Sequence, residues 1–400
     1  MTFGESHGSA VGCVVDGMPP GVSFQMSDVQ PFLDRRRPGQ SSITTTRSEK
    51  DRVEILSGVE NGRTLGTPIA MIVRNEDVRK IDYEETSGVP RPGHADFTYQ
   101  VKYGIRSSSG GGRSSARETV GRVCASALAF KYLQDRFQAN IVAFVDSVMN
   151  ISIPDTIQEC LLMSPLSRSS VDERGTLVRY VDRYEDLDGQ SYSLTDGAVL
   201  ESPQDHKCLD EALERIGTRC PHGPTSARMA SVIAKTKQEK DSCGGTITCV
   251  MNNVPVGLGE PVFDKFHAEL AKAIMSIPAV KGFEIGSGFE GSRSMRGSEH
   301  NDPIVAVDKG RAVFATNHSG GVLGGVTSGQ NVVFRVALKP VSSIGVTQST
   351  CDFEGNVQEL TLQGRHDPCV LPRAVQIVES MAAITVMDFV LRQDARQATY

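Results

Sequence analysis

The chain lacks any cysteine pair at C-x-x-C spacing, although it contains nine cysteines spread between Cys13 and Cys369. An odd number of cysteines without such pairs is typical neither of a disulfide framework nor of a zinc site, so we predict a reducing compartment and no metal site. The first residues lack a charged stretch followed by an apolar one, and no apolar run approaches the roughly 20 residues that span a bilayer. We therefore expect a soluble, cytoplasmic protein without membrane contact.

Signatures of two large ligand classes are also missing. The formal net charge of −6 argues against a general nucleic-acid-binding protein, and no G-x-x-x-x-G-K-[ST] segment supports an ATPase or a kinase. The chain does contain 39% hydrophobic and 22% charged residues, which is typical of a globular protein with a large core. Clustered arginine in such an acidic chain indicates a small anionic ligand. These arginines are Arg35, Arg36, Arg37, Arg47, Arg106, Arg113, Arg117, Arg365 and Arg373.

A glycine-rich turn that leads into a helix is the best candidate for an anion site. Residues 110–112 are all glycine, and R-S-S-A-R-E-T follows at 113–119. The glycines permit close backbone approach, and the serines are good N-cap residues at the positive end of a helix dipole. Arg113 and Arg117 add charge in a geometry suited to phosphate or carboxylate. On the loop alone, an ordinary capped helix is an equal alternative.

Short β-like runs alternate with turns and a few long helices, which predicts one α+β domain with a buried helical layer. Strands are predicted where β-branched residues gather, at 11–15, 69–73, 141–145, 246–251, 313–316 and 332–338. Helices are expected at 116–134, after Pro261 and at 373–392, and the last is apolar on most sides and therefore buried. The least patterned stretch is a surface insertion at about 150–218 in a single domain of residues 1–400.

Several motifs raise other possibilities. The segment G-E-S-H-G at 4–8 satisfies the G-x-S-x-G pattern of a serine hydrolase, but that motif needs a preceding strand in a largely completed sheet, so Ser6 as nucleophile is kept only as an alternative. Residues 286–291 match G-x-G-x-x-G, yet no helix is predicted after them, and we interpret them as a structural turn. Loops at 91–96, 317–325 and 364–368 place His or Asp beside glycine or proline, where such groups can act as acids and bases.

Six segments in one order resemble chorismate synthase, and the resemblance runs nearly from end to end. As a set they are far more specific than any single glycine motif. They are T-F-G-E-S-H-G at 2–8, D-R-R-R-P-G at 34–39, R-P-G-H-A-D at 91–96, the glycine-rich loop at 110–119, G-L-G-E-P at 257–261 and G-R-H-D-P at 364–368. The serines at 107–109 resemble those of eukaryotic, fungal-type members. Family members usually carry a first strand before the first of these segments, which here follows Met1 directly, so we expect an exposed sheet edge there.

The resemblance implies a fold and a reaction. The fold is a β-α-β sandwich, with a helical layer between two antiparallel sheets, assembled as a homotetramer. The reaction converts 5-enolpyruvylshikimate 3-phosphate to chorismate and phosphate by anti-1,4-elimination, with reduced FMN and no net redox change. It is the last common step of the shikimate pathway to aromatic amino acids. A substrate with a phosphate and two carboxylates agrees with the clustered arginines.

Two questions stay open after the resemblance. Fungal-type members reduce FMN themselves with NADPH, whereas bacterial members depend on an outside source, so NADPH-dependent flavin reductase activity is one alternative and its absence the other. A non-catalytic flavin- or anion-binding protein of the same fold is also an alternative to the enzyme. It would bind FMN without turnover.

Individual residues take roles from the resemblance. His7 resembles the histidine that keeps reduced flavin monoanionic, His94 the acid that protonates the departing phosphate, and Asp367 the carboxylate that works with flavin N5 in removing the C6 proton. The residues that resemble flavin contacts are Arg113, Ser114, Ser115, Pro278, Ala279, Gly324, Lys339, Pro340, Val341, Ser342, Ser343 and Arg365. Those that would bind the substrate's anionic groups are Arg36, Arg47, Ser115, Arg117 and Arg365.

Overall fold

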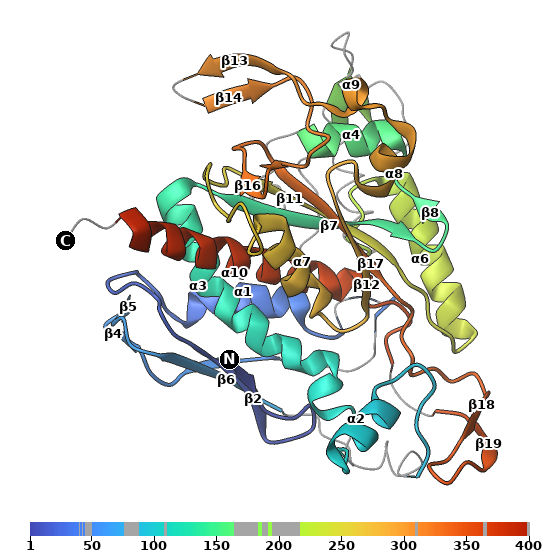
Figure 1. Cartoon of the computed structure of the whole chain (residues 1–400). Coiled ribbons are helices and arrows are strands. Elements are labelled where there is room, and N and C mark those ends of the chain that lie inside the picture. The colour runs from blue at the N-terminus through green and yellow to red at the C-terminus, as the bar shows by residue number, and fades with distance from the viewer. Residues whose placement is uncertain are drawn as a thin grey trace.

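Two antiparallel sheets form the outer layers of the molecule, as Figure 1 shows. The structure is a computed structural model that describes residues 1–39, 41, 43–44, 50–75, 88–107, 110–163, 183–185, 191–193, 217–308, 311–362 and 366–397. The four-stranded sheet runs in the order β1 (Thr2–Phe3), β2 (Ala10–Val15), β6 (Ile69–Arg74) and β3 (Val53–Ile55). The five-stranded sheet runs in the order β12 (Val280–Ile285), β17 (Val332–Leu338), β11 (Gly245–Asn252), β7 (Asn140–Val148) and β8 (Ile151–Ser152).

Four helices of the described chain lie between the two sheets. They are α1 (Met26–Arg36), α3 (Thr119–Phe137), α7 (Phe266–Met275) and α10 (Leu371–Gln397). Helices α1 and α3 contact the four-stranded sheet, whereas α7 and α10 contact the five-stranded sheet, and α10 also packs along α3 (Figure 1). The predicted α+β sandwich, with its helical layer between two antiparallel sheets, is confirmed.

The burial pattern of the strands follows their place in the layers. In β6 the alternating residues Ile69, Met71 and Val73 are fully buried against the helices, while the residues between them are partly exposed. Strand β7 is buried along nearly its whole length, which indicates cover on both faces. Each fully buried aliphatic side chain of this kind contributes about 1.5–3 kcal/mol to folding.

Helix α10 is buried, as its apolar sequence predicted. Its length and hydropathy alone would suit a membrane span, but 78% of the apolar window is buried inside the fold, as in the core helix of a globular protein. The helix carries one buried carboxylate, Glu379, which pairs with Arg35 at 3.1 Å and accepts a hydrogen bond from the Ala143 amide at 2.9 Å. These partners explain how a charged group is accommodated between the layers.

The remaining elements lie around the two sheets. The other helices are α2 (Asp96–Tyr103), α4 (Asp155–Met163), α6 (Gly223–Gln238), α8 (Gly288–Ser294), α9 (Gly297–His300) and the short 3₁₀ segments Gly112–Ser114 and Ala116–Glu118. The two-stranded ribbons are β4 (Val59–Glu60) with β5 (Arg63–Thr64), β9 (Arg183–Glu185) with β10 (Ser191–Ser193), β13 (Ile304–Asp308) with β14 (Arg311–Phe314), β15 (Val322–Leu323) with β16 (Val326–Thr327), and β18 (Gln348–Cys351) with β19 (Val357–Leu360).

Most element predictions are confirmed, with shifts at the ends. All six predicted strands are present, although the one expected at 313–316 is β14 and ends at Phe314. The helix expected at 116–134 begins as a 3₁₀ turn before α3, and α10 extends beyond its predicted range at both ends. The prediction that no helix follows the G-x-G-x-x-G segment is wrong, because α8 begins at Gly288. That helix is short and ends at Ser294, so it lacked a long periodic pattern.

The stretch interpreted as an insertion starts inside the described fold. Strand β8 pairs with β7, and Ile153, Ile157 and Leu161 belong to the hydrophobic core. The first part of the stretch therefore packs on the domain. Most of residues 164–216 lie outside the described residues, and their placement as a surface insertion stays a prediction.

Candidate active site

A cavity of about 430 Å³ opens at one end of the helical layer, where loops from both sheets meet the start of α3 and α10. It brings together residues that are up to 370 positions apart, from His7 to Ile377. The predicted site residues that line it are His7, Arg36, His94, Ser114, Ser115, Arg117, Pro278, Ala279, Lys339, Pro340, Val341, Ser342, Ser343 and Asp367. The sequence motifs thus predicted most of one continuous surface.

Four predicted residues are not among those that line the cavity. The guanidinium of Arg113 donates to Oγ1 of Thr2 at 2.6 Å and to the carbonyl of Gly4 at 2.9 Å, so this side chain fastens the first strand instead of facing the cavity. Gly324 lies in the turn between β15 and β16, with a φ of +61°. Arg47 and Arg365 lie outside the described residues. Direct ligand contact by these four stays a prediction.

The cavity has one apolar wall and one polar wall. The apolar side chains are Ile277, Pro278, Leu338, Val370, Ala374 and Ile377, from the segments before β12, at the end of β17 and at the start of α10. Opposite them lie serines, histidines and arginines. Such a surface suits a ligand with a flat apolar part and charged substituents.

His94 is held by a buried carboxylate. Its Nδ1 lies 2.9 Å from Oδ1 of Asp96, which can only accept, and 3.0 Å from Nη2 of Arg91, which can only donate. Because Nη2 of Arg91 also donates to Oδ1 of Asp96, we assign the Nδ1 proton to the hydrogen bond with Asp96. The other ring nitrogen, Nε2, faces the glycine-rich loop, where a Cβ on Gly111 would lie 3.3 Å from it. Glycine at this position leaves room for the ring and for a ligand group beside it.

Arg91 completes the cluster around Asp96. Its Nε donates to Oδ2 of Asp96 at 2.7 Å, its Nη2 donates to Oδ1 at 3.0 Å, and its Nη1 donates to Oγ of Ser343 at 3.2 Å. Burial by itself would raise the pKa of Asp96, but the hydrogen bonds from Arg91 and His94 outweigh it and hold that pKa well below its usual range. Asp96 is therefore a fixed negative charge behind His94.

His7 lies in the turn between β1 and β2. The hydroxyl of Ser6 is 3.0 Å from Nδ1 of His7, and Asn75 ties the turn down by donating to the carbonyls of Glu5, Ser6 and Gly8. Ser6 is buried and joins two strands of a hairpin, so the strand-to-helix elbow of a serine hydrolase is absent at this position.

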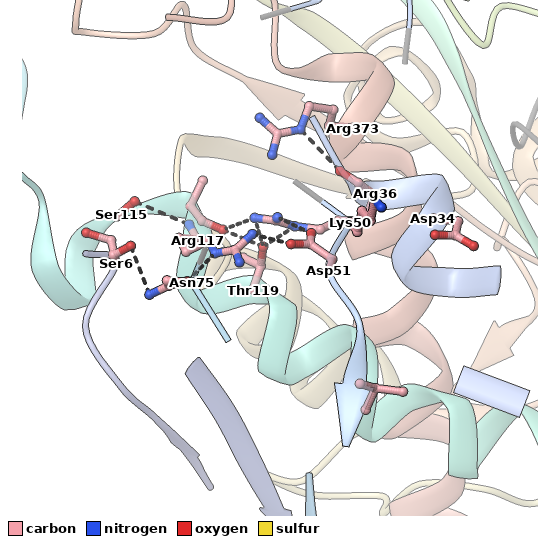
Figure 2. Close-up of polar contacts among 12 residues, drawn as sticks. Ser6, Asp34, Arg36, Lys50, Asp51, Asn75, Ser115, Arg117, Thr119 and Arg373 are labelled. Carbon is pink, nitrogen blue, oxygen red and sulfur yellow. Dashed lines mark hydrogen bonds and ion pairs between the residues drawn. The ribbon is translucent and has the colours of Figure 1, made fainter. Parts of the chain in front are cut away.

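Arg36 and Arg117 meet at a second buried carboxylate, Asp51, as Figure 2 shows. Nη1 of Arg117 donates to Oδ1 of Asp51 at 2.6 Å, and Nη1 of Arg36 lies 3.6 Å from Oδ2. Arg36 also donates to the Ala116 carbonyl at 2.6 Å and to the Thr119 hydroxyl at 3.2 Å. The two guanidinium groups thus form one fixed cationic pair on the polar wall.

Asp367 lies on the opposite side, directly before α10. It forms an ion pair with Arg373, whose Nε donates to the carbonyl of Arg36 at 3.2 Å. The pair orients the carboxylate and connects the two sides of the cavity. His366 lines the cavity beside it.

Several functional residues were missed by the sequence reasoning. Arg91 and Asp96 flank His94 within R-P-G-H-A-D, and their spacing was a usable signal. Asp51 and Asn75 stand in no recognised motif, so only the fold brings them to the arginines. Among the described residues, no group of three or more His, Cys, Asp and Glu side chains is placed to hold a metal ion.

The architecture and the cavity define a two-sheet α+β sandwich with an arginine-lined cavity, and comparison with known proteins identifies its family. A model of the chorismate synthase family matches residues 1–391. Chorismate synthase of Schizosaccharomyces pombe is 49% identical over 399 residues, which are 100% of this chain and 95% of that protein. The chorismate synthase of Saccharomyces cerevisiae is 46% identical over 401 residues, 99% and 95% of the two chains.

A solved structure agrees with the sequence relatives. A crystal structure of chorismate synthase superposes with a TM-score of 0.66 at 27% identity, and the match covers 98% of this chain and 91% of that chain. The chain belongs to the chorismate synthase family. It is thus related over its whole length to lyases of aromatic biosynthesis, and the resemblance that the six sequence segments indicated is confirmed.

Proposed function

We propose that this chain converts 5-enolpyruvylshikimate 3-phosphate to chorismate and phosphate by anti-1,4-elimination, with reduced FMN as cofactor. The observation that carries the proposal is the meeting of His7, His94 and Asp367 with Arg36 and Arg117 in one cavity. The elimination removes a phosphate from one carbon and a proton from another. It therefore needs an acid, a base and fixed cations, and the cavity contains all three.

His94 would act as the acid. Its Nδ1 proton is held by Asp96, so Nε2 is the nitrogen that can deliver a proton to the departing phosphate. In this step the ring carries a proton on both nitrogens: the one on Nδ1 is bonded to Asp96, and the one on Nε2 would pass to the phosphate. Arg91 in turn fixes Asp96 through two hydrogen bonds, so the ring keeps one orientation.

Arg36 and Arg117 would hold the anionic groups of the substrate. Two guanidinium groups and one carboxylate leave a net positive charge on this wall, in a partly buried place where charge-assisted hydrogen bonds are strong. Asp367 would take up the proton from C6, and the ion pair with Arg373 keeps its carboxylate directed at the cavity.

The residues present also fit a flavin. The apolar wall formed by Ile277, Pro278 and Leu338 suits a planar ring, and Ser114 and Ser115 offer hydroxyl groups beside the glycine-rich loop. Lys339 adds a positive charge at the edge and is anchored by its hydrogen bond to the Gly93 carbonyl at 2.7 Å. When bound, reduced FMN would lend electron density to the allylic system of the substrate and recover it, without net redox change.

The experiment that tests the function is anaerobic chorismate formation followed by absorbance. Chemically reduced FMN is used first, and oxidised FMN with NADPH second. Turnover in both indicates that the chain reduces its own flavin, and turnover only in the first indicates dependence on an outside reductant. FMN binding without turnover in either assay would contradict the enzyme and support a binding protein of the same fold.

We extend the proposal to a homotetramer in the cytoplasm. The ribbon of β13 and β14 supports assembly, because Ile304, Val305 and Val307 are more than half exposed on a hairpin that projects from the body of the molecule (Figure 1). Exposed apolar residues that cluster in this way are typical of subunit contacts. Sedimentation velocity would measure the assembly, and cell fractionation the location.

A further inference from the structure

The carboxylate of Asp51 is the meeting point of three separate segments. It stands just before β3, while Arg36 ends α1 and Arg117 lies in the 3₁₀ turn before α3 (Figure 2). The Asp51 side chain is 0% exposed, and those of Arg36 and Arg117 are 2% and 10% exposed. Arg36 and Arg117 line the cavity and Asp51 does not, so Asp51 can act on a ligand only through the arginines.

The backbone at Asp51 is held in an uncommon conformation. Its φ is +45°, in the left-handed region that few residues other than glycine, asparagine and aspartate enter at low cost. The side chain of Gln30 secures this turn, because its Nε2 donates to the Asp51 carbonyl at 3.2 Å and its Oε1 accepts from the Val53 amide at 3.3 Å. The turn directs the Asp51 side chain inward, toward the arginine pair.

Electrostatics explains what the carboxylate does there. Two guanidinium groups at close range in a poorly hydrated place repel each other, and a carboxylate between them removes that repulsion and fixes their separation. We propose that Asp51 is a positioning residue that sets the spacing of Arg36 and Arg117 for the anionic groups of the substrate. This inference rests on the function proposed above.

The same contacts extend to the turn that carries His7 and to Asp367. Nε of Arg117 donates to Oδ1 of Asn75 at 3.0 Å, and Asn75 binds the turn that carries His7. On the other side, Arg373 donates to the Arg36 carbonyl and pairs with Asp367. Asp51 therefore stands in the middle of a chain of polar contacts that crosses the cavity from the His7 turn to Asp367.

The test compares Asp51→Asn with Glu54→Gln. Asparagine keeps the size of the side chain and tolerates a positive φ, so the first variant removes the charge with little change to the turn. Glu54 lies three residues further along and pairs with Arg74 on the surface, with its side chain 44% exposed, so the second variant makes the same chemical change away from the cavity. Asp51→Gly is a second variant that relieves the positive φ and also lacks the carboxylate.

Two measurements are made on each variant. Calorimetric titration with 5-enolpyruvylshikimate 3-phosphate gives the dissociation constant without turnover, and steady-state kinetics with chemically reduced FMN gives KM and kcat. We expect Asp51→Asn to weaken substrate binding and raise KM on the order of 10- to 100-fold, with a smaller effect on kcat. The free energy of a hydrogen bond to a charged group corresponds to a change of affinity of this size. Glu54→Gln should match the wild type in both measurements.

The outcomes separate the two proposals. Absence of turnover in the wild-type protein contradicts the proposed function. Wild-type turnover with a dissociation constant for Asp51→Asn within twofold of the wild type overturns the role of Asp51. If Asp51→Asn does not fold, Asp51→Gly is judged by the same criterion, and failure of both to fold at the assay temperature assigns Asp51 to folding and also overturns the positioning role.

Discussion

Asp96 and Asp51 are both almost fully buried, with 5% and 3% of their surfaces exposed, and each contacts two basic side chains that line the cavity. Asp96 has a third basic partner, Arg106, at 3.4 Å, which is not among the residues that line the cavity. Asp96 faces Arg91 and the titratable His94, whereas Asp51 faces Arg36 and Arg117, which are always charged. The first carboxylate therefore decides where a proton lies, and the second decides where fixed charges lie. Under the proposed function, a buried carboxylate among basic side chains serves proton transfer where one partner titrates and anion binding where none does.

The largest expected effect comes from His94→Ala, which removes the titratable partner. We expect kcat for chorismate formation to fall about 100- to 1,000-fold, since a positioned general acid contributes at this level. Substrate binding, measured by calorimetry, should change little. An undiminished rate in the anaerobic assay would remove His94 from its proposed role and end the contrast between the two carboxylates.

Asp96→Asn is expected to have the second-largest effect on activity. The amide can turn either its oxygen or its NH2 group to Nδ1 of His94, so it no longer fixes the proton there, and kcat should fall about 10- to 100-fold. Because Arg91 and His94 hold the folded-state pKa of Asp96 well below the ordinary value of about 3.9, its contribution to stability is present above about pH 4 and is lost progressively as the pH falls from there toward the lower pKa.

The stability of Asp96→Asn provides a second measurement. At pH 7 the free energy of unfolding should fall by about 3 kcal/mol, because Arg91 loses a buried partner. Urea denaturation of both proteins at pH 7 and at pH 3 measures this, and the difference between them should be smaller at the lower pH. A difference that is unchanged at pH 3 would argue against a charged Asp96.

Arg117→Lys sharpens the second half of the comparison. The planar guanidinium of Arg117 donates to Asp51 and Asn75 together, and the single ammonium group of a lysine cannot reproduce both contacts. KM should therefore rise about tenfold, while kcat changes less. Arg122→Lys is the matched control, since Arg122 lies on α3 and donates to Ser276 outside the cavity. Equal KM values for the two variants would show that the guanidinium geometry at Arg117 is not needed.

The smallest effect on activity is expected from His222→Asn. His222 is a useful contrast to His94, because its ring contacts the hydroxyl of Thr225 and not a carboxylate. Burial, followed by the charge of Arg228, lowers the pKa of His222 to about 4. The unfolded state, with a pKa near 6.5, binds the proton first, so the stability of the wild type falls as the pH drops from about 6.5 to 4. Between these pH values the free energy of unfolding of His222→Asn should therefore fall by about 2 kcal/mol less than that of the wild type, and its rate of chorismate formation should be unchanged. Parallel urea midpoints across that pH range would contradict the assignment.

The sequence predicted which residues line the cavity better than it predicted the contacts between them. Motifs that combine glycine with His, Asp or Arg marked His7, His94 and Asp367, and these three do meet. The contacts of Asp51 were not predicted, because its left-handed φ and its buried ion pair depend on segments that are distant in the sequence. Arg113 shows the reverse case: its place in the glycine-rich loop predicted a ligand contact, but the structure turns its side chain toward Thr2.

The secondary structure was likewise predicted only in part. Runs of β-branched residues predicted the strands, and the apolar sequence of α10 predicted its burial. Helix α1 was missed because Pro31 interrupts its pattern and its apolar residues are few, so its helical state depends on packing against α3. Local patterns are read reliably when they are long, whereas short or interrupted elements depend on tertiary contacts.

The position of α10 between the sheets has a consequence for biosynthesis. This helix supplies Ala374 and Ile377 to the cavity, and Asp367 lies in the segment that leads into it, so α10 completes a site that begins at His7, far earlier in the chain. Without α10 the described part of the layer between the sheets would hold only α1, α3 and α7, and the faces of β7 and β11 that α10 covers would stay open to water. A nascent chain in which α10 has not yet emerged would therefore expose this apolar surface, which is the condition under which partly made chains aggregate.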